Sequence, residues 1–236
     1  MKPGNIVHPR VLCGRLKPIL SACLAGMLLL TLASTVRADS AKIGIVVFNG
    51  VLTSDVTAPI EVFGAASKKA WFSSYQVVVI SATQDKSVTT EEGLTIVADS
   101  TIYDELELDV LLVASAYDMD PWLNNRDLID FIERQGRQTK WLASNCSGAF
   151  LLGKAGLLDG KRATTWAGGE RGLAKAFPAV HVQHNTNVVI DEGVITSNGG
   201  PVSYQAALEL LARLSSEKNA QEIAEAIQFT RLKNAF

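Results

Sequence analysis

Cysteine is scarce in this sequence, and its scarcity limits the available chemistry. Only three cysteines occur in 236 residues, and two of them, Cys13 and Cys23, fall within the first 38 positions. Beyond that segment Cys146 stands alone, which excludes an internal disulfide there. Histidine is almost as rare, with only His181 and His184 in the same part of the chain. The sequence offers no cluster of potential metal ligands, so we expect no metal site.

Acidic residues are missing from the first 38 positions, which carry five basic residues instead. An almost wholly apolar run covers residues 18–34, and the small-residue pattern Val36-Arg37-Ala38 follows it. A basic start, an apolar middle and such an end are typical of a secretory signal peptide. We predict that residues 1–38 are a signal peptide cleaved near Ala38, and that residues 39–236 form a single periplasmic or secreted domain. The alternative is a retained membrane anchor, since the run lies at the short end of the roughly 17–25 residues that span a bilayer.

Without this segment, the chain has fewer basic than acidic residues. Cleavage lowers the number of Lys and Arg from 22 to 17 while Asp and Glu stay at 24, a net charge of about −7. Such a chain has no general electrostatic attraction for nucleic acid. We expect no helix-turn-helix module in the short stretch after Leu214. The expected partner is a small-molecule substrate or ligand, with no nucleic acid and no membrane contact after cleavage.

Segments typical of strands and of helices alternate through residues 39–236. The strand-like segments are rich in Val, Ile and Leu, and they are Lys42–Phe48, Tyr75–Ser81, Asp109–Ala114 and Lys140–Ser144. The helix-like segments are Pro59–Lys69, Pro121–Gln135, Ser147–Ala155, Pro201–Leu214 and Glu217–Ala226. Short hairpins are predicted around residues 91–93 and 191–193. This alternation predicts an α/β fold with a mainly parallel sheet covered by helices on both faces.

Cys146 lies between an apolar strand that runs to Ser144 and a helix that begins at Ser147. In open α/β sheets, ligands bind in the crevice at the carboxyl ends of the strands. Unpaired N–H groups at a helix N-terminus stabilise anions, so this position predicts a lowered pKa for the thiol. Gly148 would let the helix backbone pack close to the turn. The pattern is typical of a nucleophile elbow. The alternatives are that Cys146 fills the core and that Ser147 only caps the helix.

Two stretches of the chain carry a resemblance to a known family. Asn49–Phe63 (NGVLTSDVTAPIEVF) resembles the opening strand, loop and helix of the ThiJ/PfpI family. Asn145–Leu152 (NCSGAFLL) and Ala155–Trp166 (AGLLDGKRATTW) resemble its cysteine elbow and the segment after it. Within the family, the similarity is greatest to the isonitrile hydratase branch and to the ligand domains of AraC-type regulators. The resemblance implies a class I glutamine amidotransferase-like fold, a flavodoxin-like three-layer sandwich that is usually a homodimer.

The resemblance also implies roles for three residues. Cys146 matches the family nucleophile, and Asp55 matches the acidic residue that faces the thiol from the first βα loop. Ser147 matches the hydroxyl residue that follows the cysteine. An acid beside a thiolate in a poorly solvated cleft has a raised pKa, so we expect Asp55 to act as a general acid. The alternative for Asp55 is a turn or cap ahead of the helix at Pro59.

In an isonitrile hydratase-like reaction, the Cys146 thiolate would attack the isonitrile carbon. Asp55 would donate a proton, and water would complete the hydration to an N-substituted formamide. Ser147 would orient substrate or water. This scheme needs no metal and no organic cofactor.

Three departures separate the sequence from the family pattern. Thr164-Thr165-Trp166 lacks the histidine that many relatives carry before the Trp, and Ser147 replaces the histidine of the protease-like branch. Val113–Tyr117 (VASAY) replaces a Pro-Gly-Gly loop that supplies an oxyanion amide. Gly199-Gly200-Pro201 is interpreted as a turn and a helix start, and the alternative is that it lines the same crevice. Three functions therefore stay open: an exported isonitrile hydratase-like hydro-lyase, a non-catalytic ligand-binding or thiol-sensing protein, and a cysteine hydrolase or deglycase.

Overall fold

Buried aliphatic strands build the centre of the protein. The computed structural model describes Met1, residues 40–69 and residues 74–234. Seven strands form the main sheet in the order β10-β11-β7-β6-β1-β2-β5. They are β1 Ala41–Val47, β2 Tyr75–Ser81, β5 Ser100–Thr101, β6 Val110–Val113, β7 Trp141–Asn145, β10 Val188–Asp191 and β11 Val194–Ser197. Every neighbouring pair is parallel except β10 with β11.

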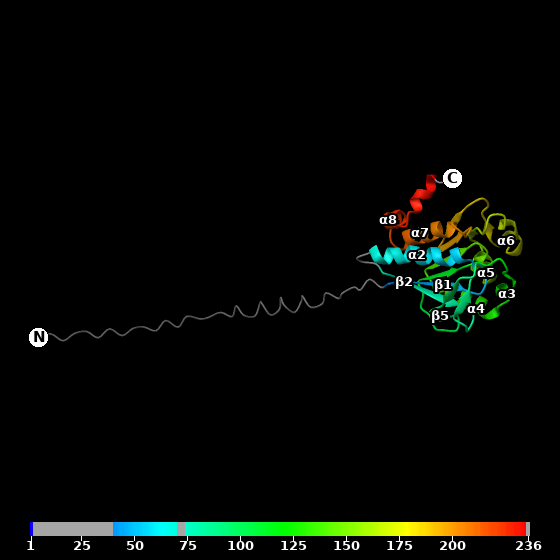
Figure 1. Ribbon diagram of the computed structural model, residues 1–236, viewed down its shortest axis with the longest axis horizontal. Coiled ribbons are helices and arrows are strands. Elements are labelled where there is room, and N and C mark those ends of the chain that lie inside the picture. Colours follow the sequence, from blue (N-terminus) through cyan, green and yellow to red (C-terminus); the bar gives the residue numbers. More distant parts are fainter. Residues whose placement is uncertain (2–39, 70–73, 235–236) are drawn as a thin grey trace. The chain divides into compact units, whose positions relative to one another are not determined.

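Helices cover both faces of this sheet (Figure 1). One group consists of α2 Thr53–Lys69, α7 Val202–Leu214 and α8 Glu217–Ala226, which contact one another. The other consists of α3 Asp120–Leu123, α4 Arg126–Gly136 and α5 Gly148–Lys154. The central strand β6 is buried along its whole length, as strands covered on both faces are. The prediction of a mainly parallel sheet between two helical layers is confirmed.

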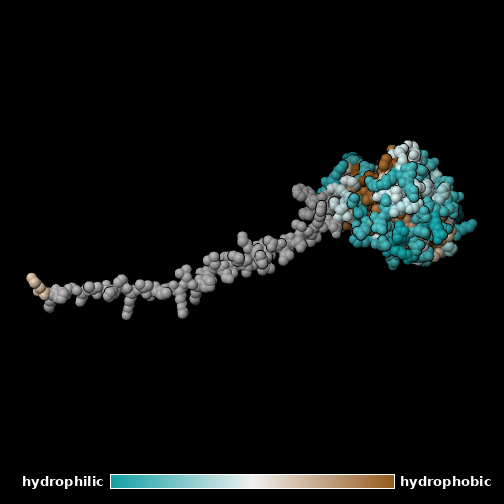
Figure 2. All heavy atoms as spheres, turned by 90° about the horizontal axis from the view of Figure 1, so that it is seen from below, coloured by the Kyte–Doolittle hydropathy of each residue, from teal (hydrophilic) through white to brown (hydrophobic). Residues whose placement is uncertain are grey.

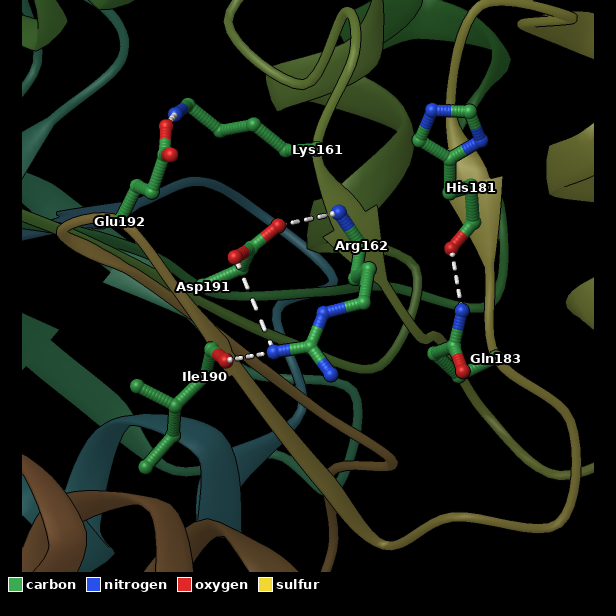
Figure 3. Close-up of polar contacts among 7 residues, drawn as sticks. All are labelled: Lys161, Arg162, His181, Gln183, Ile190, Asp191 and Glu192. Atoms are coloured by element: carbon green, nitrogen blue, oxygen red, sulfur yellow. Dashed lines mark hydrogen bonds and ion pairs between the residues drawn. The ribbon is translucent and has the colours of Figure 1, made fainter.

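Smaller elements lie at the margins of the sandwich. They are the hairpin of β3 Ser87–Thr89 with β4 Thr95–Val97, the pair of β8 Arg162–Ala163 with β9 His181–Val182, α6 Glu170–Ala176 and the 3-10 helix η1 Phe229–Asn234. Figure 3 shows how β8 attaches to β10. The backbone N–H of Arg162 donates to Asp191 Oδ2 at 2.7 Å, and its guanidinium donates to the carbonyl of Ile190 at 3.1 Å. These contacts hold the segment that follows α5 against the edge of the sheet.

The prediction that Pro59 opens its helix is wrong. Helix α2 begins at Thr53 and contains Pro59 in its interior. Proline has no N–H, so the carbonyl of Asp55, four residues earlier, loses its helical donor. The side-chain amide of Asn145 donates to that carbonyl at 3.1 Å instead. A contact between segments far apart in the sequence therefore accommodates a proline that local rules place at a helix start.

The single helix predicted from Pro121 to Gln135 is two helices in the structure. The chain leaves α3 after Leu123 and enters α4 at Arg126. Asn125 between them has an extended backbone, and its side chain accepts a hydrogen bond from the N–H of Leu128 at 3.1 Å. An asparagine in this position caps the new helix, because it satisfies an N–H that has no partner within the helix.

The predicted signal segment, residues 1–38, lies outside the described residues apart from Met1. Within the described ranges, no helix is both long enough and apolar enough to cross a bilayer. Hydrophilic residues predominate on the face drawn in Figure 2, and hydrophobic residues reach it only in a limited area. The large apolar side chains that are fully buried instead lie within the sandwich, among them Phe48, Phe63 and Phe131.

Candidate functional site

Four loops meet at the carboxyl-terminal edge of the sheet. They follow β1, β6, β7 and β11, which are successive parallel neighbours. The first loop leads to Asp55, the second contains Ser115, the third contains Cys146 and the fourth contains Gly199. Strand order and direction therefore bring together residues that are up to 144 positions apart in the sequence. Ligands of open α/β sheets bind at this edge.

Cys146 adopts a backbone conformation that is unusual for a residue with a side chain. Its φ is 50°, in the left-handed region, which costs on the order of 1–3 kcal/mol for a residue other than glycine. Three hydrogen bonds hold it there. Its N–H donates to the carbonyl of Ser197 at 2.9 Å, and its own carbonyl accepts from Thr165 Oγ1 at 2.7 Å and from the N–H of Ala149 at 3.4 Å. This strained strand-to-helix turn is the predicted nucleophile elbow.

Gly148 explains how α5 can begin so close to the sheet. A Cβ on this residue would lie 2.4 Å from the carbonyl oxygen of Val113 and 2.9 Å from that of Ala114. Both are backbone atoms, so neither can rotate out of the way. The prediction that Gly148 permits close packing at the turn is confirmed, and the approach also sets the distance between Cys146 and the loop after β6.

Asp55 is completely buried and is surrounded by hydrogen-bond donors. Its Oδ2 accepts from Ser115 Oγ at 2.5 Å. Its Oδ1 accepts from Ser203 Oγ at 2.8 Å and from the N–H of Gly200 at 2.9 Å. A Cβ on Gly199 would lie 3.1 Å from Asp55 Oδ1 and 2.4 Å from Cys146 Cβ. Gly199 therefore borders both the carboxyl and the cysteine, and the two groups predicted to act together lie close to one another.

Burial raises the pKa of Asp55 above its ordinary value of 3.8, and hydrogen bonds from Ser115, Ser203 and Gly200 oppose the rise without cancelling it. Transfer from water disfavours the charged carboxylate more than these three donors stabilise it. The expectation of a raised pKa for Asp55 is therefore confirmed. Of the two expected causes, poor solvation is the one that acts, since burial is the largest contribution.

The prediction that the helix N-terminus lowers the pKa of Cys146 is wrong. Burial raises the pKa of the thiol above its ordinary value, and repulsion by the charge of Asp55 is the second cause. Hydrogen bonds from the Ser115 hydroxyl and from the N–H and hydroxyl of Ser147 act in the opposite direction but are smaller. The helix that begins here has only seven residues, so its dipole is short. Cys146 is a resting thiol rather than a preformed thiolate.

Ser147 contributes its hydroxyl to the site rather than to a helix cap. Its side chain makes no capping hydrogen bond to α5. Instead Ser147 Oγ donates to the carbonyl of Ala116 at 2.9 Å. The capping alternative for Ser147 is therefore wrong. Its hydroxyl connects the elbow with the loop after β6, and its single proton is donated to the Ala116 carbonyl.

Several residues of this site were not singled out by the sequence patterns. Ser203 carries no motif, and Ser115 stands out only because it occupies the loop that departs from the family's Pro-Gly-Gly. Gly199-Gly200-Pro201 does form a turn that leads into α7, with Pro201 at the N-cap. It also lines the crevice, as the alternative interpretation held, because Gly199 packs on Cys146 and Gly200 binds Asp55. A pair of glycines directly after a β-strand was the available signal, since it permits a close backbone approach.

The two histidines take no part in these contacts. His181 lies in β9 and is exposed (Figure 3). His184 is also exposed and lines a cavity of about 490 Å³ together with Arg171 and Asn198. The hydrogen bonds found for Asp55 and for the Cys146 thiol, among the described residues, come from serine hydroxyls and backbone N–H groups. In the described part of the chain, no three His, Cys, Asp or Glu side chains are grouped as metal ligands would be.

The raised pKa of Asp55 predicts a specific pH dependence of stability. The folded protein binds the Asp55 proton more tightly than the unfolded chain, so this residue contributes stability below pH 3.8 that is lost as pH rises through its folded pKa. Asp55→Asn keeps the shape but cannot ionise. Urea unfolding at a series of pH values is expected to show wild type losing stability relative to Asp55→Asn as pH rises. A relative gain for wild type would contradict this account.

The fold and the site define an α/β protein with a cysteine at a strand-to-helix elbow beside a buried carboxyl group. The model of the DJ-1/PfpI family matches residues 41–213. The chain belongs to that family, which confirms the resemblance to ThiJ/PfpI proteins drawn from Asn49–Phe63 and from the cysteine elbow.

Relatives within the family have been given different functions. The chain is 30% identical over 189 residues to isonitrile hydratase of Pseudomonas putida, a match that covers 80% of this chain and 78% of the relative. It is 26% identical over 149 residues to the HTH-type transcriptional regulator GbdR of Pseudomonas aeruginosa, covering 63% of this chain but only 40% of the regulator. Among solved structures, a ThiJ/PfpI family protein from Pseudomonas syringae superposes with a TM-score of 0.72 at 26% identity, covering 80% and 75% of the two chains.

Proposed function

We propose that this protein hydrates a small isonitrile, or a similar small substrate, through Cys146 with Asp55 as general acid. The observation that carries the proposal is the buried Asp55 carboxyl held beside the elbow cysteine, with a raised pKa that favours its proton-carrying form. A raised pKa makes this carboxyl a better proton carrier than an ordinary aspartate, and a general acid has to carry a proton. The similarity to isonitrile hydratase along most of both chains supports the choice of reaction.

The reaction can be written with this chain's own residues. The sulfur forms a bond with the terminal carbon of R–NC, and the thiol proton passes to the carboxylate that Asp55 becomes as it acts as the acid. Asp55 delivers a proton to the same carbon, which yields a thioimidate R–N=CH–S–Cys146. Water then adds to this carbon, and the nitrogen takes a proton. Cleavage of the C–S bond releases the formamide R–NH–CHO and restores the thiol, so the net change is the addition of one water.

The surroundings of the cysteine support a small substrate with an apolar group. Trp166 follows Thr165, whose hydroxyl binds the Cys146 carbonyl, and its ring stacks on Phe150 with centroids 5.4 Å apart. Tyr117 follows Ala116, whose carbonyl binds the Ser147 hydroxyl, and it is 78% exposed. Exposed aromatic side chains on both loops that hold the elbow are suited to contact an alkyl or aryl substituent.

Incubation with a simple alkyl isonitrile tests the proposal. We expect wild type to produce the formamide, Cys146→Ala to produce none, and Asp55→Asn to be slower by roughly 10²–10⁴, the range typical of a lost general acid. Formamide is measured by NMR. The single cysteine beyond residue 38 makes alkylated wild type a matched control, because it keeps the fold and blocks only the thiol. Formamide production that survives Cys146→Ala would exclude this mechanism.

A second candidate is a ligand-binding or thiol-sensing protein without turnover. The resting thiol supports it, because burial and the charge of Asp55 both disfavour the thiolate. The regulator GbdR, similar to this chain over 40% of its own length, supports the same alternative. Isonitrile binding without formamide in the experiment above would favour it.

Export and dimerisation are part of the proposal as well. Export rests on the basic and apolar pattern of residues 1–38, and a mature protein that begins at Asp39 on N-terminal sequencing would support it. A homodimer is the assembly that the family resemblance implies.

A further inference from the structure

A polar cavity of about 490 Å³ lies beside the cysteine elbow. Its wall is built from the loop before α6, the first residues of α6, the loop between β9 and β10, and the residue that follows β11. The residues that give it polar side chains are Glu170, Arg171, His184, Asn185, Asn187 and Asn198. Such a concave site with convergent polar groups is suited to hold the polar end of a small molecule.

The wall of the cavity is hydrogen-bonded to the elbow. The side-chain amide of Asn198 donates to the carbonyl of Thr165 at 2.5 Å, and Thr165 Oγ1 donates to the carbonyl of Cys146 at 2.7 Å. Gly199, which follows Asn198, packs on Cys146. The chain from Thr165 passes through Trp166 directly into the cavity wall. A ligand in the cavity therefore lies against the two segments that hold the cysteine.

Hydrogen-bond donors in the cavity are left without protein partners. Within the described part of the chain, the guanidinium of Arg171 makes no hydrogen bond and no ion pair. The side chains of His184, Asn185 and Asn187 make no hydrogen bond to the described residues either. Glu170 is the one acid in the wall, and its Oε2 already accepts from the N–H of Gly168 at 2.8 Å. The charged group that stays available to a ligand is therefore a cation.

We propose that this cavity binds the carboxylate of a small substrate or ligand whose reacting end lies at Cys146. The planar guanidinium of Arg171 can donate two parallel hydrogen bonds to a carboxylate, and the neighbouring amides can donate further ones. The charge of Glu170 balances that of Arg171, so a group with one negative charge fits better than a dianion such as phosphate.

The proposal defines a substrate class. It is an isonitrile whose apolar substituent passes Trp166 and ends in a carboxylate at Arg171. The inference rests on the proposed function in one respect, namely that the reacting end of the molecule is the group attacked by Cys146. Binding of the carboxylate does not need turnover, so it can be tested with other reagents that react with a thiol.

The test compares maleimides that carry a carboxylic acid on a short, a medium or a long methylene chain with the corresponding amides. Cys146 is the only cysteine in the tryptic peptide 141–154, so mass spectrometry of this peptide gives its rate in the full chain. We expect the acid to react faster than its amide at the chain length that reaches Arg171. Arg171→Met is expected to lower that rate ratio by about tenfold to a hundredfold, as for a lost hydrogen-bonded charge. A change in the thiol itself affects both reagents equally and leaves the ratio unchanged.

Lys175→Met is the matched control, because it removes the same charge from the same helix. Lys175 lies in the last turn of α6, outside the cavity wall, and we expect its loss to leave the ratio as in wild type. Equal ratios in the two variants would assign the effect to general electrostatics and overturn the proposal. So would a wild type that prefers the acid at none of the chain lengths.

Formamide production from an isonitrile that carries a carboxylate is then compared with that from its methyl ester. Arg171→Met is expected to raise KM for the acid by the same factor and to leave kcat, and both constants for the ester, unchanged. An acid and an ester that wild type and Arg171→Met hydrate equally well would reject the carboxylate site and keep the hydration. Absence of formamide with either compound, together with an alkylation ratio that depends on Arg171, would reject the hydration and keep the site.

Discussion

Gly199→Ala is expected to remove nearly all reactivity of Cys146. The residue has φ of 78°, and an added Cβ would lie 2.4 Å from Cys146 Cβ and 3.0 Å from its backbone nitrogen. Contacts below 3.0 Å do not occur between such atoms, so the cysteine or the loop has to move. A displacement of about 1 Å can cost on the order of 10² in rate. We expect alkylation at high pH and formamide production both to fall by at least that factor.

Gly200→Ala is the control for this substitution. Gly200 also has a positive φ, 58°, yet no atom lies within 4 Å of the position of an added Cβ. The substitution keeps the N–H that binds Asp55. Its cost is backbone strain of about 1 kcal/mol, so the reactivity of Cys146 is expected to change by only a few fold. Equal losses in the Gly199 and Gly200 variants would show that backbone strain, and not contact with Cys146, is responsible.

Asn145→Leu is expected to lower the free energy of unfolding by about 2–4 kcal/mol. Asn145 is buried, and its amide joins two parts of the site. Nδ2 donates to the carbonyl of Asp55, and Oδ1 accepts from Ser197 Oγ at 2.7 Å. Leucine has a similar volume and provides neither bond, so the buried Asp55 carbonyl loses its donor and the buried Ser197 hydroxyl loses its acceptor. Urea unfolding measures the change.

Pro59→Ala provides a test of why Asn145 matters. The carbonyl of Asp55 needs the Asn145 amide because Pro59 cannot donate to it. In the double variant Asn145→Leu with Pro59→Ala, the N–H of residue 59 can form the missing helical hydrogen bond. We expect the double variant to recover roughly 1–2 kcal/mol of the loss. A purely additive double variant would show that the proline and the asparagine are not coupled through this carbonyl.

Much of the sandwich could be predicted from local sequence. Runs such as Tyr75–Ser81 have the apolar and β-branched composition of buried strands, and the structure has β2 at the same residues. The bounds of α8, Glu217–Ala226, also agree with the prediction, since Ser216 caps the helix by accepting from the N–H of Asn219. Cys146 could be placed at a strand-to-helix turn because an apolar strand and a helix flank it directly. The strand, the helix bounds and the position of the cysteine are each determined by residues close to them in the sequence.

Other features depend on which segments the fold brings together. The start of α2 at Thr53 could not be inferred, because Pro59 is tolerated only where Asn145 supplies a donor from β7. The raised pKa of Cys146 was missed for a related reason. A helix N-terminus is visible in the sequence, but the burial of the thiol and the charge of Asp55 beside it are not.

The sequence by itself determined the family, the alternating α/β order and the cysteine at the elbow. The order of the elements and the elbow follow from composition and spacing within short stretches of chain, and the family follows from the resemblance of a few such stretches to known members. The tertiary structure alone decided that Asp55 has Ser115 on one oxygen and Gly200 and Ser203 on the other. The physical reason is that parallel strands place the loops after β1, β6, β7 and β11 at one edge of the sheet. Proton affinities in the site depend on contacts between these loops, and no single loop contains them.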